Sequence, residues 1–280
     1  MKVVNIFHAL FICNVREVRH NKTRVTLAVS RAPVQLALPL LVMAILLFYH
    51  PWVLLKGRCI KCLDWFTVIS RVLTTLAIVV LLVFDSFRRR LQLLALLTDL
   101  STASTTVQTR GLLSVRGLQL GVLFVCNVLA FVDIVDTVYR TGSFALIPGV
   151  LTGFVVEHYI LLHALFCQLL AESMAHAYDN LRREIASQPN WHGTLQDMLA
   201  LEQCLQQHSE VFGFKLLLLF LHLLLNISFC AYDIARKLIG EDPRSGVYHL
   251  SIIVSQGSAA LFGLCFYYNQ LLVKVSSYGK

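Results

Sequence analysis

Residues 212–235 read FGFKLLLLFLHLLLNISFCAYDIA, an almost unbroken apolar run with Lys215 near its start and Asp233 near its end. A hydrocarbon core about 30 Å thick is crossed by roughly 20 helical residues at a rise of 1.5 Å each, so the run is long enough to span a bilayer. Lipid offers the backbone no hydrogen-bond partners, and the run must therefore satisfy its own polar groups as a helix.

Similar runs recur along the whole chain and leave little material for a soluble domain. The six expected spans are 34–55, 65–84, 118–139, 144–170, 212–235 and 249–273. The composition agrees, with 57% hydrophobic residues, 14% charged residues and a mean hydropathy of +0.69. We expect an all-α fold, a polytopic transmembrane helical bundle with six spans.

The positive charges indicate the orientation of this bundle. Fifteen Lys and Arg fall in the N-terminal tail, the second and fourth loops and the C-terminal tail, against seven in the other three loops. The positive-inside rule then places the N-terminus in the cytoplasm, and six spans return the C-terminus to the same side. The net charge of +8 is explained as this orientation signal, so we expect membrane lipid and no nucleic acid as partner.

The resulting organisation has three parts. Residues 1–33 form a cytoplasmic tail, 34–273 the transmembrane bundle with cytoplasmic helical stalks at 171–211, and 274–280 a second cytoplasmic tail.

The stalks are predicted because helical periodicity continues past the fourth span. An apolar stripe at helical spacing continues beyond the span as far as Ile185, and the segment 188–193 then interrupts the helix. Thr194 with Asp197 predicts a cap for the next helix, which turns Leu195, Met198, Leu199, Leu205 and Phe212 inward and continues into the fifth span. Both stalks must bury their stripes, on each other or on stalks of neighbouring subunits.

Small residues at a spacing of four predict close helix contacts within the membrane. They are Gly117 with Gly121, Gly149 with Gly153 and Ala259 with Gly263.

Polar residues inside the spans are the candidate site, because each costs several kcal/mol in lipid unless it faces a cavity or a partner. Asp133 and Asp136 are three residues apart and share one face of the third span. The candidate ligand-binding residues, most of them in the outer half, are Arg71, Asp133, Asp136, Tyr139, Glu157, His158, Tyr232, Asp233, His249 and Gln256. They predict a water-accessible, ligand-sized cavity. The alternative is structural salt bridges, for example Arg71 with Asp133 or Asp136. Lys215, near a cytoplasmic end, is expected to snorkel.

No catalytic motif occurs in the chain, and we expect neither an enzyme nor a cofactor. Glu157, His158 and His163 resemble zinc ligands in type. A spacing of five, however, does not put two histidines on one face of a helix, so no metal site is expected.

Several stretches together resemble the insect gustatory receptor family of the odorant/gustatory chemoreceptor superfamily. The second span is followed by the basic, leucine-rich stretch FRRRLQLLALLTDL at 87–100. The fourth span runs into LLAE at 169–172 and YDNL at 178–181, and HSEVFG at 208–213 leads into the fifth span.

This resemblance implies a chemosensory, ligand-gated cation channel in the cell membrane of sensory neuron dendrites. It further implies a small-molecule tastant bound in the outer half of each subunit, and a homo- or hetero-tetramer joined through the cytoplasmic stalks. The family's signature, a seventh helix with Thr-Tyr-x5-Gln-Phe that lines the pore, does not occur before the sequence ends at Lys280. A chain without that helix is expected not to conduct by itself.

A six-span solute transporter is the alternative from a different class. It would use Arg71, Asp133, Asp136 and Glu157 as a coupling or substrate site. Transporters commonly contain an internal repeat, and the long fourth loop has no counterpart in the first half of this chain.

Overall fold

The computed structural model describes residues 15–19, 25–29, 41, 62–103, 113–141, 147–187, 191–239 and 247–277. Nearly all of them are helical. The elements are β1 (Val15–Arg19), β2 (Val25–Val29), α3 (Cys62–Arg88), α4 (Arg90–Ala103), α5 (Leu113–Thr141), α6 (Ile147–Ser187), α7 (Trp191–Ile239) and α8 (Val247–Ser276). The first predicted span, 34–55, lies outside the described residues except for Leu41.

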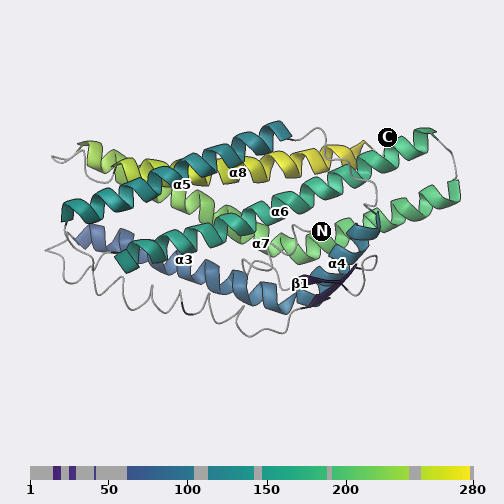
Figure 1. Cartoon of the computed structure of the whole chain (residues 1–280), viewed down its shortest axis with the longest axis horizontal. Coiled ribbons are helices and arrows are strands. Elements are labelled where there is room, and N and C mark those ends of the chain that lie inside the picture. The colour runs from purple at the N-terminus through teal and green to yellow at the C-terminus, as the bar shows by residue number, and fades with distance from the viewer. Residues whose placement is uncertain are drawn as a thin grey trace.

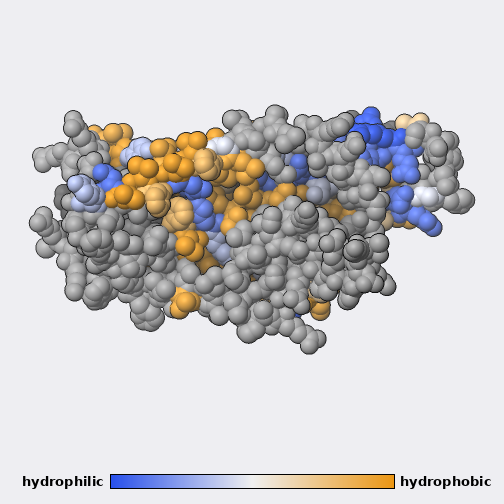
Figure 2. Space-filling model, viewed as in Figure 1, coloured by the Kyte–Doolittle hydropathy of each residue, from blue (hydrophilic) through white to orange (hydrophobic). Residues whose placement is uncertain are grey.

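The long helices run in alternating directions, so that α3, α6 and α8 end where α5 and α7 begin (Figure 1). Helix α8 packs against α5, α6 and α7, while α3 and α4 pack against α7. Apolar residues gather on the surface over α5 and α8, whereas hydrophilic residues gather at the opposite end, where α6 ends (Figure 2). On this face, the described residues thus form an apolar region and, at the other end, a polar one (Figure 2).

Three stretches are long and apolar enough to cross a membrane: Phe154–Ala186, Leu195–Ile239 and Leu250–Ser276. The shorter stretch Gln119–Val132 in α5 is also apolar. A helical, membrane-spanning character is thus supported, while the count of six spans and the orientation stay predictions.

The helical continuity predicted from the periodicity is confirmed, while the cytoplasmic position of the stalks stays a prediction. Helix α6 passes without a break from the fourth predicted span to Ser187, and its stripe Leu170, Met174, Ala177, Tyr178 and Leu181 is buried. Helix α7 likewise continues from its stalk into the fifth predicted span.

Two details of the second stalk were wrong. Helix α7 begins at Trp191 rather than after a cap at Thr194. Its buried stripe consists of Leu201, Cys204, His208, Val211 and Phe212, and this stripe leaves Leu195, Met198 and Leu199 exposed. Buried positions at i, i+3, i+7 and i+10 define one face of a helix, and Leu195 and Leu199 lie on nearly the opposite face.

The N-terminal tail contains a β-hairpin that was not predicted from the sequence. Strands β1 and β2 pair antiparallel, with Val15 opposite Val29 and Arg19 opposite Val25. Leu27 packs against the core, and the hairpin contacts α4. Helix α4 offers a leucine face there, since Leu93, Leu96, Leu97 and Leu100 are all buried at helical spacing.

In the predicted pair Ala259 with Gly263, Gly263 makes a close contact between helices, whereas the surroundings of Gly117, Gly149 and Gly153 lie outside the described residues. A Cβ added to Gly263 of α8 would lie 2.7 Å from Nε2 of Gln168 and close to the side-chain amide of Gln119. These two amides bond to each other, Gln119 Nε2 donating to Gln168 Oε1 at 2.9 Å, and Gln168 Nε2 donates to the Ala260 carbonyl at 3.1 Å. Gly121, by contrast, has open space beside it.

We predict that Gly263→Ala destabilises the protein by about 1–3 kcal/mol, because the added methyl group displaces the buried glutamine pair. Thermal unfolding of the purified protein in detergent measures the loss. Gly213→Ala is the matched control, since nothing lies within 4 Å of its added Cβ, and it should be neutral or slightly stabilising. Equal unfolding temperatures for the two variants would contradict the prediction.

Candidate functional site

A cluster of polar side chains lies inside the apolar bundle at the level of Glu157 and His158 on α6. It consists of Asn127, Glu157, His158, His222, Asn226 and Gln256, contributed by α5, α6, α7 and α8. We call these six residues the polar cluster. Because Glu157 and His158 are adjacent on a helix, they point to different sides, and each has its own set of partners.

Glu157 faces α7. Its carboxylate lies 3.3 Å from Nε2 of His222 and accepts from Nδ2 of Asn226 at 3.3 Å. His222 and Asn226 are one turn apart and buried, at 1% and 5% exposure, whereas the Glu157 side chain is 22% exposed. Two buried groups thus hold the carboxylate, while the Glu157 side chain remains partly exposed.

His158 faces α5 and α8. Its Nδ1 lies 2.7 Å from the Phe154 carbonyl and its Nε2 bonds to the Asn127 side chain. Gln256 of α8 bonds to the same Asn127 amide at 2.9 Å. Both ring nitrogens face oxygens that only accept, the Phe154 carbonyl and Asn127 Oδ1. A neutral His158 can donate to one of them, whereas a protonated ring donates to both.

Of the ten predicted site residues, three belong to the polar cluster: Glu157, His158 and Gln256. Asp136, Tyr139 and Tyr232 are exposed, Tyr139 at 87%, and Asp233 is half-buried. Arg71, Asp133 and His249 lie in α3, α5 and α8, but their side chains are outside the described residues, so the predicted Arg71 salt bridges are not tested.

Three residues of the polar cluster were not predicted from the sequence as site residues: Asn127, His222 and Asn226. His222 and Asn226 carried a signal, because they are lone polar residues four apart in a leucine run and share a face of the helix. Asn127 carried no comparable signal, since its partners come from α6 and α8.

The expectation that Lys215 snorkels was wrong. Its side chain is 3% exposed, and Nζ lies 3.8 Å from Asp85 Oδ2 and 5.3 Å from the centre of the Phe212 ring. A buried carboxylate at the end of α3 holds the ammonium inside the bundle, because a charge without a partner there would be costly.

Chemically, the polar cluster can bind and orient a ligand with hydroxyl, amide or amine groups, since it offers a carboxylate, two imidazoles and three amides. Among the described residues, no group of three or more His, Cys, Asp or Glu is placed to hold a metal ion.

Comparison with protein-family models and with curated proteins gives no match to this chain.

We predict that Glu157 and His222 are energetically coupled by about 0.5–1.5 kcal/mol, because each is the other's partner in a low-dielectric interior. The double-mutant cycle of Glu157→Gln and His222→Gln, followed by thermal unfolding, measures this coupling. Tyr139→Phe with His222→Gln is the control pair and should be additive, since Tyr139 is exposed at the far end of α5. Additivity in both cycles would contradict the pairing.

Proposed function

We propose that the chain is the ligand-binding subunit of a chemosensory membrane receptor of the gustatory type, with the polar cluster as its small-molecule site. The observation that carries the proposal is the polar cluster itself, a group of buried and half-buried polar side chains from four helices within an apolar bundle. Intramembrane ionisable residues mark functional sites by default, because their cost is tolerated only where they act or pair.

The resemblance of residues 87–100, 169–181 and 208–213 to insect gustatory receptors supports the same proposal. In this proposal the protein is a multi-pass cell-membrane protein of six spans with a cytoplasmic N-terminus. The length of α6 and α7 supports the membrane-spanning part of this proposal. Their 41 and 49 residues extend to about 60 and 70 Å, twice the thickness of the hydrocarbon core. Each helix therefore continues outside the membrane as a stalk.

A solute carrier is the second candidate, favoured by one observation. Glu157 and His222 form a titratable pair inside the bundle, and such pairs serve as proton relays in carriers. The two candidates differ in whether the ligand is bound or moved.

We predict that a tastant bound at the polar cluster raises the unfolding temperature of the wild-type protein, and that Glu157→Gln removes about half of the effect. The probes are a panel of sugars and bitter alkaloids added to the purified protein. At a ligand concentration of 100 Kd the stabilisation is about 2.7 kcal/mol, and a tenfold loss of affinity removes about 1.4 kcal/mol of it.

Asp136→Asn is the matched control, because it removes a carboxylate that is exposed on α5 and should leave the shift unchanged. Loss of the shift in Asp136→Asn alone would contradict the assignment of the site. Accumulation of a radiolabelled probe in proteoliposomes, abolished by Glu157→Gln, would show that the chain is a carrier and would contradict the receptor function.

We further propose that the α7 stalk joins subunits into a tetramer. Leu195, Met198 and Leu199 are 56%, 38% and 57% exposed in the single chain, on a part of α7 that the proposed topology puts in water. An apolar patch in water needs a partner, and equivalent stalks of other subunits present the same surface.

We predict that Leu195→Glu with Leu199→Glu dissociates the assembly, because two carboxylates would have to be buried at the contact. Native mass spectrometry in detergent measures the subunit number. Gln203→Glu is the control, since Gln203 is exposed on the same stalk, is already polar, and gains a charge without removing an apolar side chain. A monomeric wild type, or a tetramer that tolerates both stalk substitutions, would contradict the proposal.

A further inference from the structure

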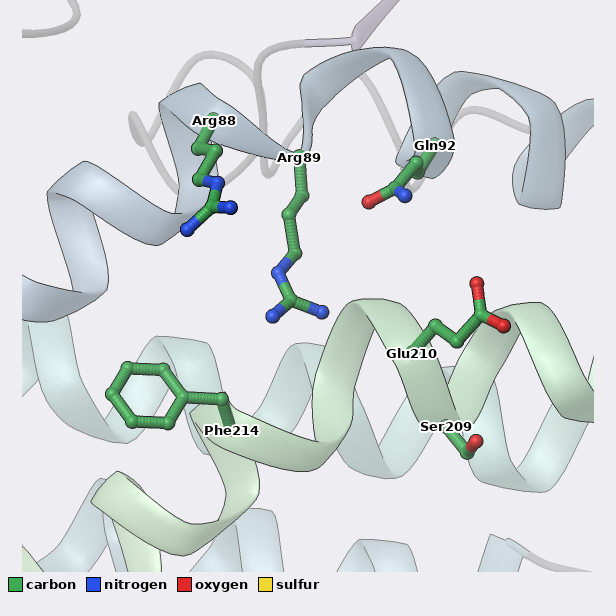
Figure 3. A pocket seen from close by; sticks show the side chains of 6 residues that line it. All are labelled: Arg88, Arg89, Gln92, Ser209, Glu210 and Phe214. Carbon is green, nitrogen blue, oxygen red and sulfur yellow. The ribbon is translucent and has the colours of Figure 1, made fainter.

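A polar cavity lies where α3 meets α4, far from the polar cluster along α7. Backbone bonds from Arg89 N to the Asp85 carbonyl and from Leu93 N to the Arg89 carbonyl, 3.0 and 2.9 Å long, carry the chain from one helix into the next. The cavity has a volume of about 540 Å³, within the range of small-molecule sites. It is lined by Arg88, Arg89, Gln92, Ser209, Glu210 and Phe214 (Figure 3).

The α3–α4 side of the cavity is positively charged. Nε of Arg89 lies 2.8 Å from Asp85 Oδ1, so the buried carboxylate fixes the guanidinium through that one nitrogen. Its two terminal nitrogens point toward α7, and the Arg88 guanidinium lies beside it (Figure 3). Two guanidinium groups at one wall form an arrangement that matches phosphate oxygens.

The α7 side carries the opposite charge. Glu210 faces the gap toward Gln92, and Ser209 lies one residue before it (Figure 3). A multiply charged anion would meet repulsion from this carboxylate. A zwitterion with a phosphate and an ammonium group finds a partner of the correct sign on each side.

Along α7, the surface beside the cavity is apolar toward Leu221 and polar toward Glu202. On α3, Phe84 precedes Arg88 by one turn and is 62% exposed. On α7, Phe214, Leu217 and Leu221 follow Glu210 at helical spacing and are 41%, 63% and 47% exposed. In the other direction, the exposed residues of α7 nearest the cavity are polar, namely Glu202, Gln203, Gln206 and Ser209. The cavity thus lies at the boundary between an apolar and a polar surface, as the headgroup of an amphiphile does.

We propose that this cavity binds the headgroup of a zwitterionic membrane phospholipid, with its phosphate between Arg88 and Arg89 and its ammonium group at Glu210. The acyl chains lie along Phe84, Phe214 and Leu217. Free phosphate shares the chemistry of the first contact but uses neither Glu210 nor the apolar residues. The proposal requires a membrane-spanning bundle and does not depend on the receptor function.

The test is native mass spectrometry of the full chain in detergent. The probes are short-chain phosphatidylethanolamine, short-chain phosphatidylglycerol, which has the phosphodiester without the ammonium group, and inorganic phosphate. We expect the wild type to bind phosphatidylethanolamine more tightly than phosphatidylglycerol, and phosphate not to compete at the concentrations at which the lipid binds.

Arg88→Gln should weaken phosphatidylethanolamine binding about tenfold, the loss typical of one charge-assisted hydrogen bond. Arg90→Gln is the matched control, because it removes the same charge from the same run, while its guanidinium lies 4.3 Å from the centre of the Phe87 ring and does not line the cavity. Glu210→Gln should abolish the preference for phosphatidylethanolamine over phosphatidylglycerol. Arg88 and Glu210 are both exposed, so the variants are expected to fold, and unfolding temperatures verify this.

Three results would overturn the proposal. If Arg90→Gln weakens binding as much as Arg88→Gln, the attraction is general surface charge. If the two lipids bind the wild type equally, Glu210 does not recognise the ammonium group of the lipid. If inorganic phosphate displaces the lipid at equal concentration, the site is a phosphate site and not a lipid site.

Discussion

Polar side chains inside this bundle have to find partners on other helices, because neither lipid nor an apolar core can replace the water they lose. Helix α6 meets this constraint at two levels. Gln168 pairs with Gln119 and with the Ala260 carbonyl. Glu157 bonds to α7 and His158 to Asn127 of α5, which also accepts from Gln256 of α8. Apolar packing tolerates small rotations of a helix, whereas these bonds are satisfied in one rotation only. They therefore fix the register of α5, α7 and α8 around α6.

The length of the helices decides where charge can be placed. Helices α6 and α7 exceed the thickness of a bilayer, so part of each must leave it. At the polar end, Lys274 of α8 donates to Asp179 of α6 at 2.7 Å, with both side chains partly exposed. Nearer the apolar region, the pair Asp85–Lys215 is buried, at 6% and 3% exposure. Charge is thus screened by water at one end and neutralised by pairing where the helices enter the core.

Local sequence pattern predicted the helices, and it could not predict their partners. The stripe from Leu170 to Leu181 is a property of α6 alone, and it correctly indicated a helix that continues beyond the span. The pairing of Asp85 with Lys215 joins positions 130 residues apart, and nothing near either residue indicates the other. Lys215 was therefore assigned to the surface by its position in the run.

The same reasoning explains the other differences. Leu195 and Leu199 were predicted to be buried because they are apolar, but the face of α7 that packs is set by α4, α6 and α8. The hairpin of β1 and β2 has strands of five residues each, too short for alternation to separate them from a polar tail. Of the candidate site, the sequence indicated the residues that are costly in lipid, and only the tertiary structure selected those that meet.

Helix α7 contributes residues to three of the polar sites among the described residues. Glu210 lines the cavity, Lys215 pairs with Asp85, and His222 with Asn226 holds Glu157. From Glu210 to Asn226 the helix rises about 24 Å. A shift of α7 by one residue would rotate it by about 100° and separate all of these partners at once. Since the buried pairs would be left without compensation, intermediate positions are costly, and α7 is held in one register along its length. A ligand bound at one of these sites therefore cannot shift α7 along its axis without also disrupting the other two sites.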